Sequence, residues 1–309
     1  MSDLTDTAPL PVVGEPGSAR PGILQRIRDV WAYRELLGNL TRKELKVKYK
    51  GSFLGFAWSL LNPILYLVVF WIVFQKILGA GIPNFPIFFL AGLLPWNLFS
   101  ISLGSGTTAI TGNASLVGRV WFPREILVIA PIGANLVHFF LQFIVLGIAL
   151  VIFRVAPSPA FMVLLPFALL TLLVLVAALG LLFAAVNVYL RDTEHLLELL
   201  LLAWFWMTPI VYPYMTVASK LKELWWVYLL NPMTSIVITF QRALYNHTTT
   251  GGGDATGVKG IATGSEIIPD ASVFWYFRNL ALVFLGSLAL FWFASWVFGR
   301  LEGDFAEEI

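Results

Sequence analysis

The sequence predicts an all-α polytopic membrane protein with six transmembrane helices. An amphipathic interface helix is expected before the first span, and short re-entrant helices are expected between spans five and six. Of the 309 residues, 58% are hydrophobic and 12% are charged, proportions that do not suit a soluble core. The basic residues are concentrated before the first span, and there are six long apolar segments: 53–78, 85–110, 126–153, 161–190, 196–212 and 273–299.

The lengths of the segments and the distribution of charge predict how the chain crosses the membrane. A helix of ~25 residues reaches ~37 Å, enough to cross a bilayer with some tilt, whereas 196–212 is near the lower limit. Nine of the twenty Lys and Arg residues lie within 20–50. Because such residues favour the cytoplasmic side, we expect a multi-pass protein of the cytoplasmic (inner) membrane with both termini in the cytoplasm.

The N-terminal region divides into a tail and a pair of predicted helices. Residues 1–22 are polar and rich in Pro and Gly, which is typical of a disordered tail. Residues 23–50 show helical apolar spacing with interleaved basic residues, which favours cytoplasmic amphipathic interface helices. Their basic end either anchors the chain on anionic lipid or also meets an anionic substrate headgroup. The headgroup candidates are Arg42, Lys43, Lys46, Lys48 and Lys50.

The remaining domains follow from this division. Residues 51–300 form the predicted six-span domain, and 301–309 form a cytoplasmic tail. In the outer loop after the fifth span, 219–245 is aromatic and amphipathic, and two short helices lying in or re-entering the membrane would bury its apolar surface. Residues 247–270 are rich in Gly and Thr, which predicts a flexible insertion.

Several kinds of chemistry have no motif in the sequence. There is no G-x-x-x-x-G-K-[ST] phosphate loop, so we expect no ATP site and no cofactor in this chain. The three histidines (His138, His195 and His247) are far apart in sequence, which argues against a catalytic metal. The spans also contain almost no charged residues of the kind that ion-coupled transporters bury. The chain is therefore expected to be a membrane body without an energy source of its own.

Polar and aromatic residues within the spans have two interpretations each. Asn135, His138 and Gln142 share one helical face, which favours hydrogen bonding between helices and alternatively a wet pathway. Aromatic residues favour interfacial belts, and some of them are alternatively the walls of a conduit on which sugar rings stack. The conduit candidates are Trp58, Trp71, Trp96, Phe99, Trp204 and Trp206.

A short charged stretch, VWFPREIL at residues 120–127, interrupts the apolar segments. Pro123 breaks any helix at this point, and the predicted topology places the stretch in the cytoplasm. By pattern alone, a plain turn with Arg on the inner side and a docking surface for a partner are equally favoured.

Ordered motifs give the chain a resemblance to a known family. TRKELKVKYKGSFLGFAWSLLNP, FLAGLLPWNLFS, NASLVGRVWFPREIL, NVYLRDTEHLL with MTPIVYP, and LNPMTSIVITFQRALY resemble the membrane subunit of ABC-2 type polysaccharide exporters, in the same order. The resemblance covers about 36–300. It departs at Val128, where the family often has proline, and at the insertion 247–270.

The resemblance implies a function and partners. It implies export of a lipid-linked polysaccharide by a homodimer with two ATP-binding cassette subunits, which would bind ATP and magnesium, and no nucleic-acid partner. An actinobacterial cell-wall galactan exporter is the narrower interpretation. The resemblance also implies that the loop around 120–127 docks onto the ATP-binding subunit. The docking residues would be Arg119, Trp121, Phe122, Pro123, Arg124 and Glu125, with Arg191 and Asp192 as a second contact or an internal ion pair.

Three alternatives stay open from the sequence. An ABC-2 permease for a drug or a lipid would share the fold class but would have a narrow, apolar path. An intramembrane glycosyltransferase or phosphotransferase would need clustered carboxylates, and the sequence shows none. A membrane-tethering scaffold would not need two charged elements on the inner side.

Overall fold

A computed structural model describes residues 22–52, 57–77, 82–118, 120, 122–221, 223, 225–246 and 266–308. Within these ranges the chain is built from helices, as the sequence predicts. The predicted disordered tail (1–22), all but its last residue, and most of the predicted insertion (247–270) lie outside the described residues. Arg119 and Trp121 also lie outside them.

The helices follow one another with short connections. The first half of the chain contains α1 (Ile23–Ala32), α2 (Arg34–Tyr49), α3 (Trp58–Phe70) with a π-helix (Trp71–Ile77), α4 (Phe85–Thr107), a 3-10 turn (Thr111–Asn113), α5 (Ala114–Val117) and α6 (Glu125–Ile152). The second half contains α7 (Pro159–Met162), α8 (Leu165–Tyr189), α9 (Thr193–Trp206), α10 (Tyr214–Leu221), α11 (Trp225–Tyr228), α12 (Pro232–Leu244), α13 (Val273–Leu301), a 3-10 turn (Glu302–Asp304) and α14 (Phe305–Glu308).

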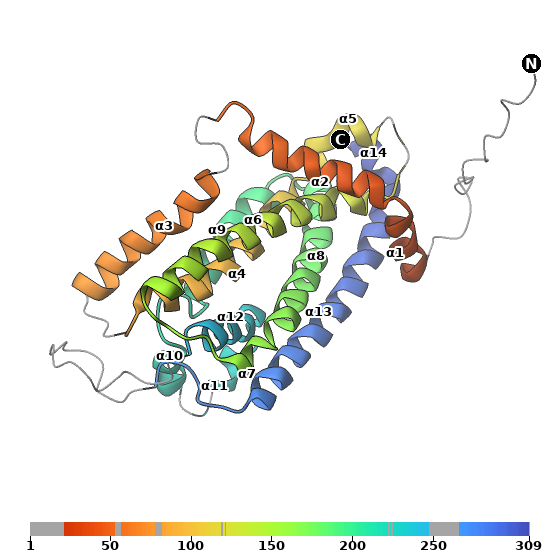
Figure 1. Cartoon of the computed structure of the whole chain (residues 1–309). Helices are drawn as coiled ribbons and strands as arrows, with labels where there is room; N and C mark the ends of the chain where they lie inside the picture. The colour runs from red at the N-terminus through yellow and green to blue at the C-terminus, as the bar shows by residue number, and fades with distance from the viewer. Residues whose placement is uncertain are drawn as a thin grey trace, which may run out of the picture.

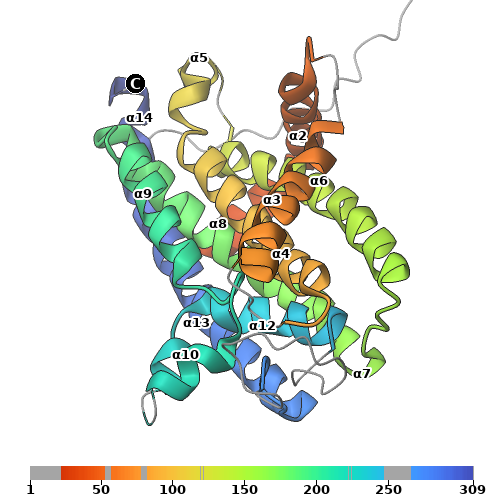
Figure 2. The same cartoon turned by 90° about the vertical axis from the view of Figure 1, so that its left-hand side faces the viewer.

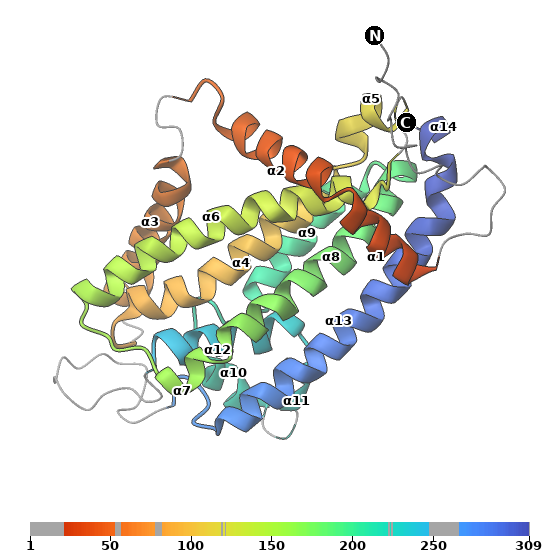
Figure 3. The ribbon, with the colours of Figure 1, turned by 45° about the vertical axis from the view of Figure 1, so that its right-hand side comes forward.

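Four long apolar helices form the body of the molecule. Helix α4 packs against α6 and α8, and α8 packs along α13, so the four form a continuous bundle (Figures 1 and 3). Each is long and apolar enough to cross a membrane, α8 together with the short α7 before it and α13 with the turn after it. They correspond to the predicted segments 85–110, 126–153, 161–190 and 273–299.

The first and fifth predicted spans are shorter helices. In place of 53–78 the structure has α3 and its π-helical continuation, with a shorter apolar core at Leu60–Phe74. In place of 196–212 it has α9, which ends at Trp206. Helix α3 lies at the edge of the bundle, against α4 and α6 (Figure 1). Four spans are therefore supported by length and composition, and the count of six stays a prediction.

Three short helices, α10, α11 and α12, occupy the region where two were expected. Helix α12 packs against α4 and α8, and eleven of its thirteen residues are buried. Its start is set by Asn231, whose side chain accepts a hydrogen bond from the Met233 N–H at 3.0 Å, as expected for an N-cap. Helix α12, which the sequence predicts to be amphipathic, is therefore buried within the bundle.

The two ends of the bundle carry different elements. Helices α1, α5 and α14 lie at one end, called the terminal end here, and α10 to α12 lie at the other, called the α12 end (Figures 1 and 2). A large apolar core joins α4, α6, α8, α12 and α13. A second, smaller core lies at the terminal end and includes Leu40, Ile110, Phe122, Ile126, Val188, Phe298 and Phe305.

Candidate functional site

The predicted headgroup residues lie on the last turns of α2 and directly after it. Arg42, Lys46 and Lys50 are exposed; Arg42 and Lys46 lie four residues apart on one side of α2, and Lys50 follows directly after the helix. We call these three residues the basic row. Lys43 donates from Nζ to Oδ1 of Asn113 at 3.0 Å, and this bond ties α2 to the 3-10 turn before α5.

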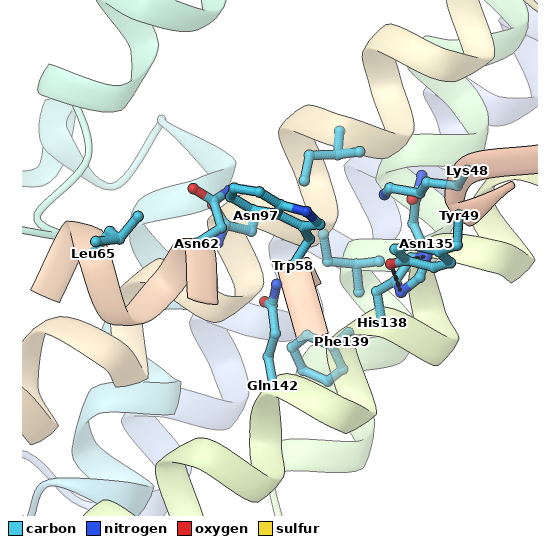
Figure 4. A pocket seen from close by; sticks show the side chains of 12 residues that line it. Lys48, Tyr49, Trp58, Asn62, Leu65, Asn97, Asn135, His138, Phe139 and Gln142 are labelled. Carbon is cyan, nitrogen blue, oxygen red and sulfur yellow. Dashed lines mark hydrogen bonds between the residues drawn. The ribbon is translucent and has the colours of Figure 1, made fainter. Parts of the chain in front are cut away.

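A cavity of about 260 Å³, in which polar groups are set among a larger apolar surface, lies beside the C-terminal end of α2 (Figure 4). Helices α2, α3, α4 and α6 enclose it, and amide side chains make up most of its polar lining. We call it the amide cavity. Its lining residues are Lys48, Tyr49, Trp58, Asn62, Leu65, Asn97, Leu98, Ile101, Asn135, His138, Phe139 and Gln142.

One face of α6 supplies the buried polar wall of this cavity. Asn135, His138 and Gln142 are all buried and line the cavity from their shared helical face. The Tyr49 hydroxyl lies 3.1 Å from Nδ1 of His138, so the end of α2 is bonded to the middle of α6. This face therefore bonds to another helix, as the first interpretation expects, and it also borders the cavity; the wet pathway stays a prediction.

Lys48 brings the positive charge of α2 to the cavity. Much of the side chain is exposed, but neighbouring atoms crowd its ammonium, and this burial lowers the pKa of Lys48 below its ordinary value. An anion held beside the ammonium would offset that penalty, because an opposite charge favours the charged form. Among the predicted headgroup residues, Lys48 is the one that lines the amide cavity.

Three of the predicted pathway aromatics form a packed cluster between α4 and α9. Trp96 and Phe99 are buried, and their ring centroids lie 5.5 Å apart. Trp204 meets Phe99 edge-on at 4.9 Å and donates from Nε1 to Oδ1 of Asn231 at 2.8 Å. Trp96 and Phe99 therefore serve the core of this chain, so they do not line an open path within it.

The other three predicted pathway aromatics lie apart from one another. Trp58 is exposed and lines the amide cavity. Trp71 is half-buried, with the Lys76 ammonium 5.2 Å from its ring. Trp206 is exposed at the end of α9. Within the described residues, Trp58 is thus the predicted pathway aromatic that adjoins the basic end of α2.

The predicted docking loop is fastened to its own chain. Phe122 is buried in the smaller core. Glu125 is 5% exposed and forms an ion pair of 2.6 Å with Arg26 of α1. Arg26 also pairs with Glu302, at 2.5 Å. One guanidinium therefore joins α1, the start of α6 and the end of α13; we call these three residues the Arg26 triad.

Arg124 strengthens the same junction. It donates to the main-chain carbonyl of Glu302, and its guanidinium lies 5.7 Å from the centre of the Phe305 ring. Sequence reasoning expected Phe122 and Glu125 to face a partner, but in the structure both are occupied by internal contacts. Docking by the loop stays a prediction, and an exposed residue available for it is Val120, which is 58% exposed.

Arg191 and Asp192 lie at the same end of the molecule. They follow α8, whose Tyr189 donates from its hydroxyl to the Leu301 carbonyl at 3.1 Å. Both residues are exposed, and among the described side chains no ion pair joins them. Their side chains are open to a second molecule, so the second docking contact also stays a prediction.

Sequence reasoning missed Arg26, Glu302 and Asn97. A signal existed for Arg26, because it lies three residues after Ile23 and four before Val30, on the apolar side of its helix. Asn97 stands alone as an amide in an otherwise apolar stretch of α4. Glu302 had no such signal, because nothing in the spacing shows which segment the end of α13 will meet. Among the described residues, no group of three or more His, Asp or Glu could hold a metal ion.

Comparison with known protein sequences shows the family of this chain. Residues 35–245 match the family model for the ABC-2 type transporter. The chain is 35% identical over 93% of its length, and 100% of the relative's, to the O-antigen export system permease protein RfbA of Myxococcus xanthus.

More distant relatives have related names. The chain is 27% identical over 69% of its length to an O-antigen export system permease protein RfbA of Klebsiella pneumoniae, covering 82% of it. It is 24% identical over 63% of its length to the polysialic acid transport protein KpsM of Escherichia coli, covering 75% of it. This chain belongs to the ABC-2 type transporter family, as a membrane-embedded transport protein and not an enzyme.

Proposed function

We propose that the chain is the membrane subunit of an ATP-driven exporter that moves a lipid-linked polysaccharide across the cytoplasmic membrane. The observation that carries the proposal is the basic end of α2 beside an amide-bearing cavity at the edge of the bundle. A lipid-linked glycan carries an anionic pyrophosphate and a hydroxyl-rich sugar, and these two features match the two surfaces. The names of the relatives, O-antigen and polysialic acid transport proteins, support the same class of substrate.

ATP would be used by a separate subunit. The sequence has no phosphate-binding loop, so two ATP-binding cassette subunits would bind ATP and magnesium. The loop ending at Glu125 and the exposed Arg191 and Asp192 all lie at the terminal end. Because the Arg26 triad ties this loop to α1 and α13, a push on the loop would move these elements together.

In the proposed topology the terminal end faces the cytoplasm, and the chain crosses the membrane six times. Helix α3 with its π-helix covers Trp58–Ile77, twenty residues that approach the ~30 Å of a hydrocarbon core. Helix α9 covers fourteen residues, so the segment between it and α10 would complete the fifth crossing, and α10 to α12 would lie toward the outer side. Helices α1 and α2 would lie at the cytoplasmic interface, which the excess of Lys and Arg in 20–50 supports.

A homodimer would give the conduit its second wall. Exposed apolar side chains follow α3 and α9, and these are the two helices that lie at the margin of the four-helix body. The faces include Val68, Val69, Ile72, Leu196, Leu199 and Leu202. Pairing of two copies along these faces would enclose a path beside the amide cavity.

The amides of the cavity favour a glycan over a drug or an apolar lipid. Four amide side chains line it, and an apolar ligand would leave Asn135 and Nδ2 of Asn97 without hydrogen-bond partners, at a cost of ~1–3 kcal/mol each. A cell-wall galactan is the narrower proposal. Its test is depletion of the protein followed by sugar analysis of the lipid-linked glycan that accumulates in the inner leaflet.

Co-purification tests the division of labour between the subunits. The chain alone should show no ATP hydrolysis, and a complex with its ATP-binding partner should hydrolyse ATP and contain two copies of each. Hydrolysis by the isolated chain at the rate of the complex would contradict the proposal.

A further inference from the structure

We propose that the amide cavity is a binding site for the sugar ring attached to the pyrophosphate of the lipid-linked substrate. This inference rests on the proposed function and adds to it the place where the first sugar is recognised. The Lys48 ammonium lies at one end of the cavity and amide side chains line the rest of its polar surface, and this difference assigns the two parts of the ligand to two places.

Two amides of the cavity, Asn135 and Asn97, have polar groups without partners among the described residues. The Asn135 side chain is 7% exposed, and no hydrogen bond to another described residue involves it. Nδ2 of Asn97 is buried without a partner. Inside a membrane protein such groups are costly unless something satisfies them. A ligand with several hydroxyl groups would supply the missing donors and acceptors.

The lining selects a neutral, hydroxyl-rich ligand. An amide both donates and accepts hydrogen bonds, as a sugar hydroxyl does, and no carboxylate lines the cavity to attract a cation. Trp58 offers an aromatic face, on which the C–H face of a sugar ring can stack. Figure 4 shows this ring between the Asn62 end and the His138 end of the cavity.

The cation at the cavity sets the direction of the ligand. Lys48 lies at the α2 end of the cavity (Figure 4). A pyrophosphate would lie against the Lys48 ammonium, outside the amide lining. The sugar attached to it would then point toward Trp58 and Asn97.

The size of the cavity restricts the ligand to a short piece. Its volume of about 260 Å³ lies below the ~300–1,000 Å³ of sites for drug-sized ligands. One sugar ring fits this range, whereas a polymer of many rings does not. The cavity would therefore bind only the reducing-end sugar, and the rest of the glycan must follow another path.

The test compares two kinds of lipid on the complex with its ATP-binding partner in nanodiscs. The probes are a short polyprenyl pyrophosphate without sugar and the same lipid carrying one N-acetylglucosamine, galactose or glucose. Binding is measured by native mass spectrometry. We expect at least one sugar probe to bind about tenfold more tightly than the sugarless lipid, since one or two hydrogen bonds are worth ~1.4 kcal/mol together.

Substitutions test whether the preference for the sugar-bearing lipid arises in this cavity. Asn135→Leu and Asn97→Leu should each reduce the ratio of the two affinities to about one, while the sugarless lipid still binds. Trp58→Phe should keep more of the preference than Trp58→Ala. Lys48→Gln should weaken both kinds of probe equally. The matched control is Asn187→Leu, which removes a buried amide of α8 that does not line this cavity and should leave the preference unchanged.

Two outcomes would overturn the inference. One is equal binding of all four lipids by the wild-type complex, which would mean that the cavity holds water only. The other is an undiminished preference in both asparagine variants. Export of the full glycan, measured in parallel, separates the claims: export without a sugar preference removes the subsite alone, and absence of ATP-driven export removes the proposed function.

Discussion

Arg26 holds the terminal end of the molecule together through two carboxylates. Its guanidinium meets Glu125 at 2.6 Å and Glu302 at 2.5 Å, and both Arg26 and Glu125 are buried. Removing one member of a buried ion pair leaves an uncompensated charge and typically costs ~3–5 kcal/mol. We therefore expect the loss of any one residue of the triad to lower the stability of the protein.

Replacement of Arg26 gives the first prediction. Arg26→Ala should lower the free energy of unfolding by ~3–5 kcal/mol, because Glu125 is then buried without a cation. The double variant Arg26→Ala/Glu125→Gln should lose less than the sum of the single variants, with a coupling of ~0.5–3 kcal/mol. Denaturant unfolding of the purified protein measures all three variants. Strictly additive losses would show that the pair does not interact.

Gly299 gives a second prediction at the same junction. A Cβ at this position would collide with the Arg26 guanidinium, which the two carboxylates hold in place. Gly299→Ala should therefore destabilise the protein by ~1–3 kcal/mol, as overpacking does. Gly286→Ala is the matched control in the same helix, since nothing lies within 4 Å of a Cβ there. Equal melting temperatures for the two variants would contradict this account.

The sequence shows little of these residue contacts. Glu125 was expected to face a partner because the family resemblance implies a docking loop at 120–127. The cation that permits its burial is Arg26, 99 residues earlier in the chain. Helical periodicity predicts which residues share one face of a helix, but it does not predict which two faces pack together. The polar face of α6 was predictable because its three residues share one helix, whereas its unpartnered neighbour Asn97 comes from another.

At the scale of elements, the loop before α6 contains a buried residue, Phe122, and an exposed residue, Val120. Phe122→Ala should lower stability by ~3–5 kcal/mol, because it empties a buried aromatic site in the smaller core. Val120→Asp changes an exposed residue, so it should leave the melting temperature unchanged but weaken the complex with the ATP-binding subunit. Pull-down and thermal unfolding distinguish the two effects. Full partner binding by Val120→Asp would count against docking at this residue.

The basic row on α2 gives the fourth prediction. Changing Arg42, Lys46 and Lys50 to Gln should lower export of lipid-linked glycan severalfold, since each basic residue near an anionic surface contributes ~1 kcal/mol. The control changes three exposed cations elsewhere in the chain, Arg154, Lys220 and Arg278, and so alters net charge equally.

Export is measured as the glycan left in the inner leaflet after depletion and rescue. Only variants confirmed to have the N-terminus inside are compared, because basic residues also set topology. If the α2 variant clears the glycan as fast as the control, the headgroup role is wrong.

Element boundaries show where sequence reasoning succeeds. Four apolar segments became long helices because each is a continuous run of sufficient length. Helix α12 was expected to be amphipathic at a membrane face, yet packing against α4 and α8 buries nearly all of it. The polar residues of α12 are mainly Thr, Ser and Gln, and some of them bond within the bundle; Gln241, for example, donates to the Pro209 carbonyl at 2.9 Å. The hydroxyls of Thr234 and Ser235, in contrast, are buried without a partner among the described residues.

At the scale of the whole molecule, the two ends have different tasks. The terminal end carries the loop, the basic row and the ion pairs of Arg26, and the α12 end carries the short helices α10 and α11 and the buried α12 (Figure 2). The amide cavity lies between them, beside α3 at the edge of the bundle. Motion of the terminal end would therefore reach the cavity through α2 and α6, which the Tyr49–His138 contact joins.

The central claim is that this chain moves a lipid-linked polysaccharide only when an ATP-binding partner drives it. The most direct measurement uses proteoliposomes that contain both subunits, with labelled lipid-linked polysaccharide and ATP on the side of the ATP-binding subunit. A lectin on the opposite side reports the glycan that has crossed. The account predicts a signal that requires both subunits, ATP and magnesium. Crossing by this chain alone, or ATP hydrolysis by the complex without any crossing, would contradict it.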